Sequence, residues 1–257
     1  MRIALTIAGS DSGGGAGIQA DLKTFQRFGV YGTSVVTAVT AQNTRGLRAL
    51  HPVPASAVKA QLDALADDLP PAAFKTGMLA TAEIVHEVAA GIIRHDFANF
   101  VLDPVWRAGS GDTLLTPEAE QAMREKLLPL ATLVTPNLTE AARLTGLPAT
   151  DAGTMAKAGE RLLELGAGAA LVKGGHLEGD ALVDLLITRD GAREFRHSRI
   201  ARHTHGTGCT LSAAITAGLA LGQPLATAVA IAIEYVQRAI ARAPDLGTER
   251  SPLQHGV

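Results

Sequence analysis

The sequence predicts an α/β fold: a three-layer α/β/α sandwich around a mainly parallel central sheet. Strand-like and helix-like segments alternate along its 257 residues. Strands that are separated by helices of about 10–15 residues favour a parallel sheet covered on both faces. No Pro-, Ser- or Gly-rich linker divides the chain and no internal repeat is found, so residues 1–257 are expected to form a single domain. Apolar residues, at 47%, supply a sizeable core, and a charged fraction of 19% argues against disorder.

The first half of the chain yields alternating strands and helices. The strands are short apolar or β-branched runs, whereas the helices carry apolar residues at helical spacing, as Ile18, Leu22 and Phe25 do. The predicted strands are residues 3–8, 33–40, 74–76 and 100–102. The predicted helices are residues 18–28, 55–69 and 82–95.

The second half continues this alternation and then adds a hairpin and two terminal helices. Residues 182–188 and 194–200, parted by the turn Arg189–Gly191, are expected to pair as an antiparallel hairpin. The other predicted strands are residues 132–135 and 169–173. The predicted helices are residues 117–128, 139–145, 155–165, 210–221 and 225–241.

Charge and cysteine content exclude several function classes. The formal net charge is −2 and the 23 Lys and Arg residues are scattered, so no binding to nucleic acid or to a membrane is expected. The N-terminal apolar run stops at Ser10–Asp11, too early for a signal peptide, and no apolar run reaches the roughly 18 residues that span a bilayer. The single cysteine is compatible with a reducing compartment. The expected location is the cytoplasm.

Residues with chemical potential follow one predicted strand after another. In sheets of this kind, ligands bind beyond the carboxyl ends of the strands. The residues found there are the loop Gly9–Gly17, Gln42, Met78, Asp103, Asn137 and Lys173. Their shared placement predicts one common site.

The start of the helix near residue 210 predicts an anion site. Gly206, Thr207 and Gly208 stand where a helix exposes unpaired N–H groups and the positive end of its dipole. Cys209 lies in the first turn, where the same field is expected to lower its thiol pKa. An anion cradle that contains a potential base suggests phosphoryl transfer to an alcohol.

Several of these residues also have ordinary structural interpretations. Asp21 is either a ligand contact beside the glycine loop or a solvated helix charge. Gln42 offers an amide to a heteroaromatic edge or belongs to a plain turn. Met78 contacts a flat ring or fills the core. Neither a G-x-G-x-x-G fingerprint nor a Walker A loop fits the glycines of residues 9–17.

The polar residues of the later strands raise the same question. Asp103, Asn137 and Glu140 could organise Mg²⁺ largely through water. The alternative is helix capping, with Asn137 or Thr139 as the cap and Glu140 favoured in the first turn, and it alone explains Glu140. Lys173 leaves an apolar strand just before Gly174, where it either neutralises phosphate or is a charge that extends to solvent. Cys209 on its own would be a small buried hydrophobe.

Taken together, the motifs resemble the ribokinase-like superfamily, and closely the hydroxymethylpyrimidine/phosphomethylpyrimidine kinases of thiamine synthesis. The resemblance runs essentially from end to end. Each short motif is weak, but five in the family's order are a specific signal. The motifs are residues 4–24, Ala41-Gln42-Asn43-Thr44, Thr135-Pro136-Asn137 with Glu140, Lys173-Gly174-Gly175-His176, and residues 205–210.

The resemblance implies a kinase that uses ATP with Mg²⁺. It implies phosphorylation of the 5-hydroxymethyl group of 4-amino-5-hydroxymethyl-2-methylpyrimidine, then a second transfer to the monophosphate, by a homodimer. The pyrimidine pocket carried over by position is Gly9, Asp21, Gln42, Met78 and Val105. Gly206, Thr207, Gly208 and Cys209 form the anion hole, with Cys209 as base. Lys173, Gly174, Asn137 and Thr207 face the ATP phosphates, and Asp103 and Glu140 face the metal.

One departure and three rivals accompany this interpretation. After Val105 the family commonly has methionine and, soon after, lysine, whereas this chain has Trp106-Arg107-Ala108-Gly109. Arg107 is a possible replacement for the lysine. The rival functions are a pyridoxal kinase, a non-catalytic pyrimidine-binding sensor, and a dinucleotide oxidoreductase. Gln42-Asn43-Thr44 favours the aminopyrimidine over pyridoxal, because an amide can pair with a ring nitrogen and an amino group.

Overall fold

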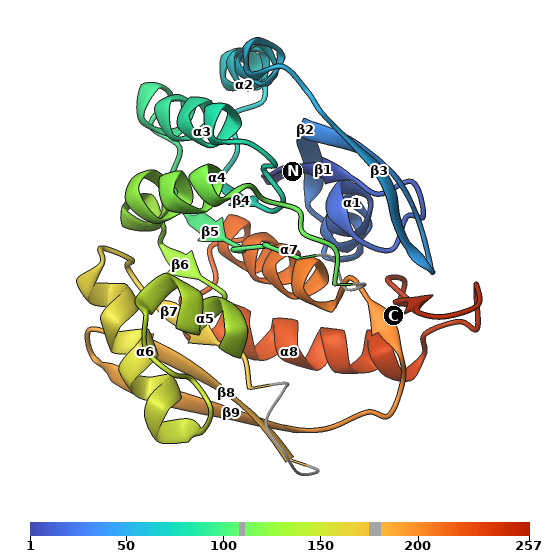
Figure 1. Ribbon diagram of the computed structural model, residues 1–257, viewed down its shortest axis with the longest axis vertical. Helices are drawn as coiled ribbons and strands as arrows, with labels where there is room; N and C mark the ends of the chain where they lie inside the picture. Colours follow the sequence, from blue (N-terminus) through green and yellow to red (C-terminus); the bar gives the residue numbers. More distant parts are fainter. Residues whose placement is uncertain (108–110, 175–180) are drawn as a thin grey trace.

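A large sheet runs through the middle of the protein. The computed structural model describes residues 1–107, 111–174 and 181–257 (Figure 1). The sheet has nine strands in the order β3-β2-β1-β4-β5-β6-β7-β8-β9. The six strands β2, β1, β4, β5, β6 and β7 run parallel to one another. At one edge β3 pairs antiparallel with β2, and at the other edge β8 pairs antiparallel with both β7 and β9. The predicted mainly parallel α/β fold is confirmed.

The bounds of the elements follow the predicted order closely. The strands of the large sheet are β1 (Ile3–Ser10), β2 (Tyr31–Asn43), β3 (Gly46–Pro52), β4 (Ala73–Thr76), β5 (Phe100–Leu102), β6 (Leu133–Val134), β7 (Ala170–Val172), β8 (Ala181–Thr188) and β9 (Gly191–Ser198). A separate pair consists of β10 (Thr204–His205) and β11 (Ser251–Pro252). The helices are α1 (Gly17–Arg27), α2 (Ala55–Asp68), α3 (Ala82–Arg94), α4 (Pro117–Ala122), α5 (Leu138–Thr145), α6 (Ala152–Glu164), α7 (Thr207–Ala220) and α8 (Leu225–Ala241).

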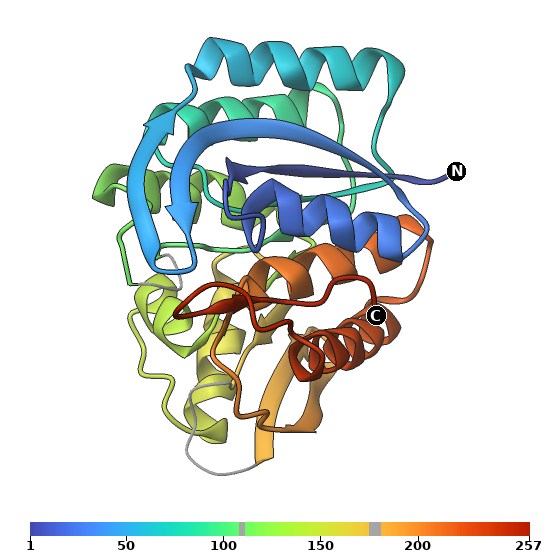
Figure 2. The same cartoon turned by 90° about the vertical axis from the view of Figure 1, so that its right-hand side faces the viewer.

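Helices cover both faces of the sheet. Helices α2 to α6 lie on one face, and α1, α7 and α8 lie on the other, with the C-terminal segment beside α7 and α8 (Figure 2). Strand residues alternate between the two layers, as in β1, where Leu5 and Ile7 pack toward α2 and α3 and Ala4 packs toward α1 and α7. In the part of the chain that the structure describes, no helix is both long and apolar enough to cross a membrane.

Two local features differ from the predictions. Strand β3 was not predicted, because its half-buried sequence alternates weakly; it pairs with β2 across a short turn in which the Arg45 N–H donates to Asn43 Oδ1 at 2.9 Å. The predicted helix 117–128 is α-helical only to Ala122 and continues as a π-helix (Met123–Leu127) and a 3₁₀ turn (Leu128–Leu130). Pro129 cannot donate an N–H to a further α-helical turn, so the helix ends there.

Candidate active site

Strand alternation brings the charged residues of three strands to the α7 face of the sheet. Phe74 packs toward α3, so its neighbour Lys75 points to the opposite face. Val101 packs against α7 and α8, and Asp103, two residues later, faces the same side. The same spacing in β7 takes Lys173 to that side as well. Three strands therefore deliver a lysine, an aspartate and a lysine to one layer.

These side chains form a row of alternating charges. Lys75 Nζ lies 3.0 Å from Asp21 Oδ1 on α1 and 4.0 Å from Asp103 Oδ2. Lys173 Nζ lies 3.7 Å from Asp103 Oδ1. The Ser212 hydroxyl of α7 donates to Asp103 Oδ2 at 3.2 Å. The row leads from the predicted pyrimidine side at Asp21 to the predicted phosphate side at Lys173.

The start of α7 lies against this row. A Cβ atom on Gly208 would be 3.5 Å from Lys173 Nζ and 3.9 Å from Asp103 Oδ2. Among the described residues, none accepts a hydrogen bond from the N–H groups of Thr207, Gly208 or Cys209, and Gly206 supplies no side-chain cap. These N–H groups are free to bind an anion beside the Lys173 ammonium. The structure brings together the anion hole, Lys173 and Asp103 that the sequence analysis placed in one site.

The glycine loop is a fixed turn that packs against the anion hole. The Asp11 carboxylate accepts from the N–H groups of Gly13, Gly15 and Ala16 at 2.8–3.0 Å. The backbone N–H of Gly17 lies close enough to the Cys209 sulfur to oppose the rise of its pKa, so the end of the loop is near the first turn of α7. These contacts favour an ordered turn over the flexible strand-to-helix turn that was one alternative.

Of the residues predicted for the pyrimidine pocket, Gln42 and Val105 are partly exposed, whereas Met78 and Asp21 are buried. Met78 covers Gly9 so closely that a Cβ on Gly9 would be 2.1 Å from its methyl carbon. The Gln42 amide has no hydrogen-bond partner among the described residues and is available to a ligand, and Val105 is half-buried. Asp21 is fully buried, with Thr6 Oγ1 donating to it at 2.6 Å. It is not the solvated helix charge that was one alternative.

The expected low pKa of Cys209 is wrong. Burial raises the pKa of the Cys209 thiol to about 12, and Asp21 and Asp103 add to the rise, against the opposing effect of Lys75. The helix field acts on a sulfur that is partly withdrawn from water and has two carboxylates nearby. In the ligand-free protein this residue is a neutral thiol.

Alkylation of Cys209 measures this directly. We expect iodoacetamide to label the folded protein far more slowly at pH 8 than it labels free N-acetylcysteine, because a pKa of about 12 leaves about one thiol in 10⁴ ionised. The rate should rise about tenfold per pH unit from pH 8 to 10. Labelling of the urea-unfolded chain at the ordinary thiol rate is the control. A plateau near pH 8 in the folded protein would contradict the assignment.

Asn137 and Glu140 form a capping box at the start of α5. The Glu140 N–H donates to Asn137 Oδ1 at 3.0 Å, and the Asn137 N–H donates to Glu140 Oε2 at 2.8 Å. The capping interpretation is confirmed for both residues. Burial raises the pKa of the Glu140 carboxyl to about 7, against the opposing charge of Lys173. Its second oxygen, Oε1, accepts no hydrogen bond from any described residue, and the charges of Asp103 and Lys173 both act on this carboxyl.

Gly174, the remaining residue predicted to bind phosphate, makes a hydrogen bond within the protein instead. The Gly174 N–H donates to Asp184 Oδ1 at 2.9 Å, so it is not free for a phosphate. Gly175 and His176 of the same motif, and Ala108 and Gly109 after Arg107, lie outside the described residues. Arg107 is exposed and pairs with Thr113 through an isolated bridge.

Lys75 is the main site residue that the sequence analysis missed. A lysine inside the four-residue buried strand β4 is itself a signal, because lysine is almost never fully buried without a partner. Burial disfavours its ammonium form, but Asp21, Cys209 and Asp103 outweigh that effect and raise the Lys75 pKa. The residue is a permanent buried cation between two carboxylates.

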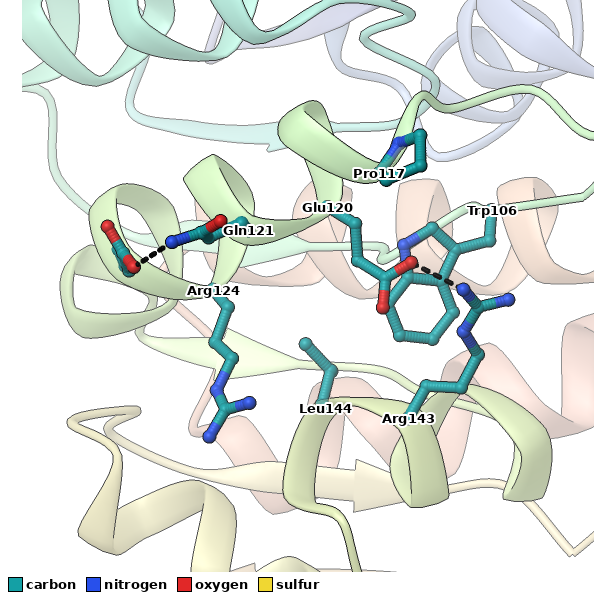
Figure 3. A pocket seen from close by; sticks show the side chains of 8 residues that line it. Trp106, Pro117, Glu120, Gln121, Arg124, Arg143 and Leu144 are labelled. Atoms are coloured by element: carbon teal, nitrogen blue, oxygen red, sulfur yellow. Dashed lines mark hydrogen bonds and ion pairs between the residues drawn. The ribbon is translucent and has the colours of Figure 1, made fainter.

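A cavity of about 590 Å³ lies between α4 and α5 (Figure 3). Within it, Arg143 stacks 4.7 Å from the centre of the Trp106 ring and pairs with Glu120 at 2.6 Å. Its lining residues are Trp106, Pro117, Glu120, Gln121, Arg124, Glu125, Arg143 and Leu144. None of them is a predicted site residue, so the buried charges and the α7 N–H groups locate the chemistry better than this cavity does.

Comparison with known proteins agrees with this geometry. Residues 11–254 match a family model described as phosphomethylpyrimidine kinase. The hydroxymethylpyrimidine/phosphomethylpyrimidine kinase of Rhizobium meliloti is 52% identical over 257 residues, covering 98% of this chain and 96% of the relative.

Two solved structures carry the likeness to three dimensions. The phosphomethylpyrimidine kinase from Clostridium difficile has a TM-score of 0.85 and 42% identity, covering 93% of this chain and 100% of that one. The pyridoxal kinase from Staphylococcus aureus in complex with AMP-PCP and pyridoxal has a TM-score of 0.92 and 36% identity, covering 100% of this chain and 94% of that one. The ribokinase-like fold is shown, and the chain belongs to the phosphomethylpyrimidine kinase family.

Proposed function

We propose that this chain transfers the γ-phosphoryl group of ATP to 4-amino-5-hydroxymethyl-2-methylpyrimidine and then to its monophosphate, giving the diphosphate used in thiamine synthesis. The observation that carries the proposal is the meeting of the free α7 N–H groups, Lys173 and Asp103 at the end of the buried charge row. Family membership makes the chain a kinase, and a relative that holds AMP-PCP supports ATP as the donor.

The chemistry assigned to these residues is in-line transfer. The N–H groups of Thr207 and Gly208 and the Lys173 ammonium receive the negative charge of the migrating phosphoryl group. Gln42, Met78 and Val105 hold the pyrimidine so that its hydroxymethyl oxygen faces that group. Cys209 is the proposed proton acceptor and acts through the small thiolate fraction that its raised pKa leaves. Proton removal therefore contributes less to the rate than charge neutralisation by the N–H groups and Lys173 does.

Replacing Cys209 with alanine tests this role. We expect turnover to fall about 10²-fold while the affinity for ATP changes little, because general-base catalysis contributes about 10²–10⁴-fold and the N–H cradle remains. The wild-type kcat should rise with pH up to pH 10, in line with a thiol pKa of about 12, and the variant should show a flat profile. Full turnover in the variant would remove the base assignment.

We propose Mg²⁺ as the metal, held by Asp103 and Glu140. The donor set fits: both are carboxylates, Glu140 Oε1 is free of hydrogen bonds from described residues, and hard oxygen ligands suit this ion. Within residues 1–107, 111–174 and 181–257, no three or more His, Cys, Asp or Glu side chains are placed so that they could hold a metal ion by themselves, so water and phosphate oxygens would complete the shell. When bound, Mg²⁺ would neutralise charge on the ATP phosphates.

Glu140→Gln distinguishes the two roles of this side chain, since it keeps a helix-capping side chain and removes the titratable carboxyl. Glutamine can still close the capping box, so we expect the variant to gain stability over wild type as pH rises from 4.5 to 7. In that window the wild-type carboxyl keeps its proton when folded and loses it when unfolded, so wild-type stability falls with rising pH; below 4.5 and above 7 the difference is constant. Urea unfolding at pH 4 to 8 measures it, and a gap that does not change with pH would contradict the pKa shift. The Mg²⁺ concentration for half-maximal turnover should rise about tenfold.

A pyridoxal kinase is the second candidate, favoured by the 36% identity and TM-score of 0.92 to the pyridoxal-bound relative. Mass spectrometry of the products from ATP, Mg²⁺ and the hydroxymethylpyrimidine tests the main proposal. We expect two products, the monophosphate and the diphosphate of the pyrimidine. Steady-state kinetics with both alcohols decides between the candidates, and a strong preference for pyridoxal would overturn the choice. An absence of ATP consumption would favour a pyrimidine-binding sensor.

The family resemblance also supports a homodimer of single-domain subunits in the cytoplasm. Light scattering coupled to size-exclusion chromatography measures the subunit number, and a mass near that of one 26.5 kDa chain would contradict the dimer. Fractionation of source cells measures the location.

A further inference from the structure

Three side chains from three elements hold the backbone beside Lys173. Asp184 of β8 accepts the Gly174 N–H on Oδ1 at 2.9 Å. Its other oxygen, Oδ2, lies 3.0 Å from His197 Nε2 on β9. His197 Nδ1 lies 3.0 Å from Gln237 Nε2 on α8. Asp184 is 5% exposed, whereas His197 and Gln237 are partly buried.

The hydrogen-bond pattern fixes the direction of each contact. The Gln237 amide nitrogen can only donate, so His197 Nδ1 accepts, and the ring proton is on Nε2. His197 Nε2 therefore donates to Asp184 Oδ2, which leaves Oδ1 directed at Gly174. The imidazole, with its Nε2–H directed at Oδ2, sets the orientation of the carboxylate, as a second group orients a metal-binding or catalytic side chain elsewhere.

The backbone of Lys173 is consequently held from both sides. Its own N–H donates to the Pro136 carbonyl at 2.9 Å, at the end of β6. The next peptide N–H, that of Gly174, is held by Asp184. The Lys173 side chain leaves the strand between these two anchors and reaches Asp103 and Gly208. A shift of the second anchor would redirect the ammonium.

We propose that Asp184, oriented by His197 and Gln237, is a positioning residue that directs the Lys173 ammonium at the phosphoryl group during transfer. The inference rests on the proposed function of this site, and it assigns a role to residues that contact neither substrate. The Asp184 charge also lies close enough to Lys173 to favour its ammonium form, together with the nearer carboxylates.

A double-mutant cycle tests the role. Asp184→Ala, Lys173→Met and the double variant are assayed for kcat and for the KM of ATP and of whichever alcohol the wild type phosphorylates. We expect Asp184→Ala to lower kcat at least tenfold in the wild-type background and less than twofold in the Lys173→Met background, because groups that act through one another are not additive. The KM of the alcohol should be unchanged.

Two further variants keep the test independent of folding. Asp184→Asn retains the Oδ1 acceptor for Gly174 and should keep kcat within about threefold of wild type. Its amide nitrogen can donate to His197 Nε2 once the ring proton moves to Nδ1 and the Gln237 amide turns its oxygen toward that proton. His197→Ala should show the same dependence on Lys173 as Asp184→Ala, in weaker form. His51→Ala, an exposed histidine on β3, is the matched control and should leave kcat unchanged.

The outcomes are distinct from those for the proposed function. Equal losses of kcat in both backgrounds, or no loss in the wild-type background, would overturn the positioning role and leave the kinase assignment intact. A wild type that phosphorylates no alcohol would overturn the kinase assignment before the cycle begins.

Discussion

Gly206→Ala is expected to lower the rate of phosphoryl transfer at least about 10³-fold. A displacement of the site residues by about 1 Å lowers such a rate about 10²-fold, and each N–H donor lost to the transferring group lowers it by a further factor of about 10²–10³. Gly206 has a φ of +84° and precedes the first N–H of the anion hole. A Cβ there would lie 1.8 Å from the Gly15 carbonyl oxygen, which is backbone and fixed by the Asp11 turn. Either the glycine loop or the start of α7 must move, and both form the site.

Gly222→Ala is the matched control at the other end of α7. Its φ is +81°, close to that of Gly206, but a Cβ there meets nothing within 4 Å. We expect it to lower the free energy of unfolding by about 1 kcal/mol through the left-handed backbone alone and to leave kcat unchanged. Turnover and urea unfolding of both variants are compared. Similar kcat values for the two variants would show that the contact between the loops does not shape the anion hole.

The fold and the position of the site could be predicted because they follow from local patterns. Alternation of strands and helices predicts a parallel sheet, and the carboxyl ends of parallel strands meet at one edge. The sequence pattern alone therefore predicts that Asp103 and Lys173 lie close together. Strand β3 could not be predicted in this way. Its sequence has weak alternation, and it forms because β2 offers it an edge from Ala38 to Asn43.

The charge states of the site could not be predicted, because they depend on neighbours distant in the sequence. The helix start around Cys209 indicated a lowered thiol pKa. In the folded chain, however, Asp21 and Asp103 lie near the sulfur, and they precede Cys209 in the sequence by 188 residues (209 − 21) and 106 residues (209 − 103). Lys75 could have been found from its place inside an apolar strand. The Asp184 contacts carry no such signal, since His197 lies in an exposed-looking hairpin strand.

Lys75→Met is expected to destabilise the protein by about 3–5 kcal/mol, because it removes one partner of a fully buried ion pair and leaves the Asp21 charge uncompensated. Methionine is close to lysine in length and leaves little cavity. Burial already raises the pKa of Asp21 against the opposing charge of Lys75, so the variant should bind a proton at Asp21 to avoid a buried charge. Urea unfolding of wild type and variant measures the loss.

The double variant Asp21→Asn with Lys75→Met separates the two causes of that loss. If the uncompensated carboxylate is responsible, removing it should recover most of the free energy of unfolding, since a neutral pair of similar volume is often as stable as the buried ion pair it replaces. The Thr6 hydroxyl still has an amide oxygen to donate to. Activity should not return with stability, because Asp103 then faces the α7 N–H groups with Lys173 as its only nearby lysine among the described residues. A double variant as unstable as Lys75→Met would show instead that packing of the lysine stem stabilises β4 and that the charge row is incidental to the fold.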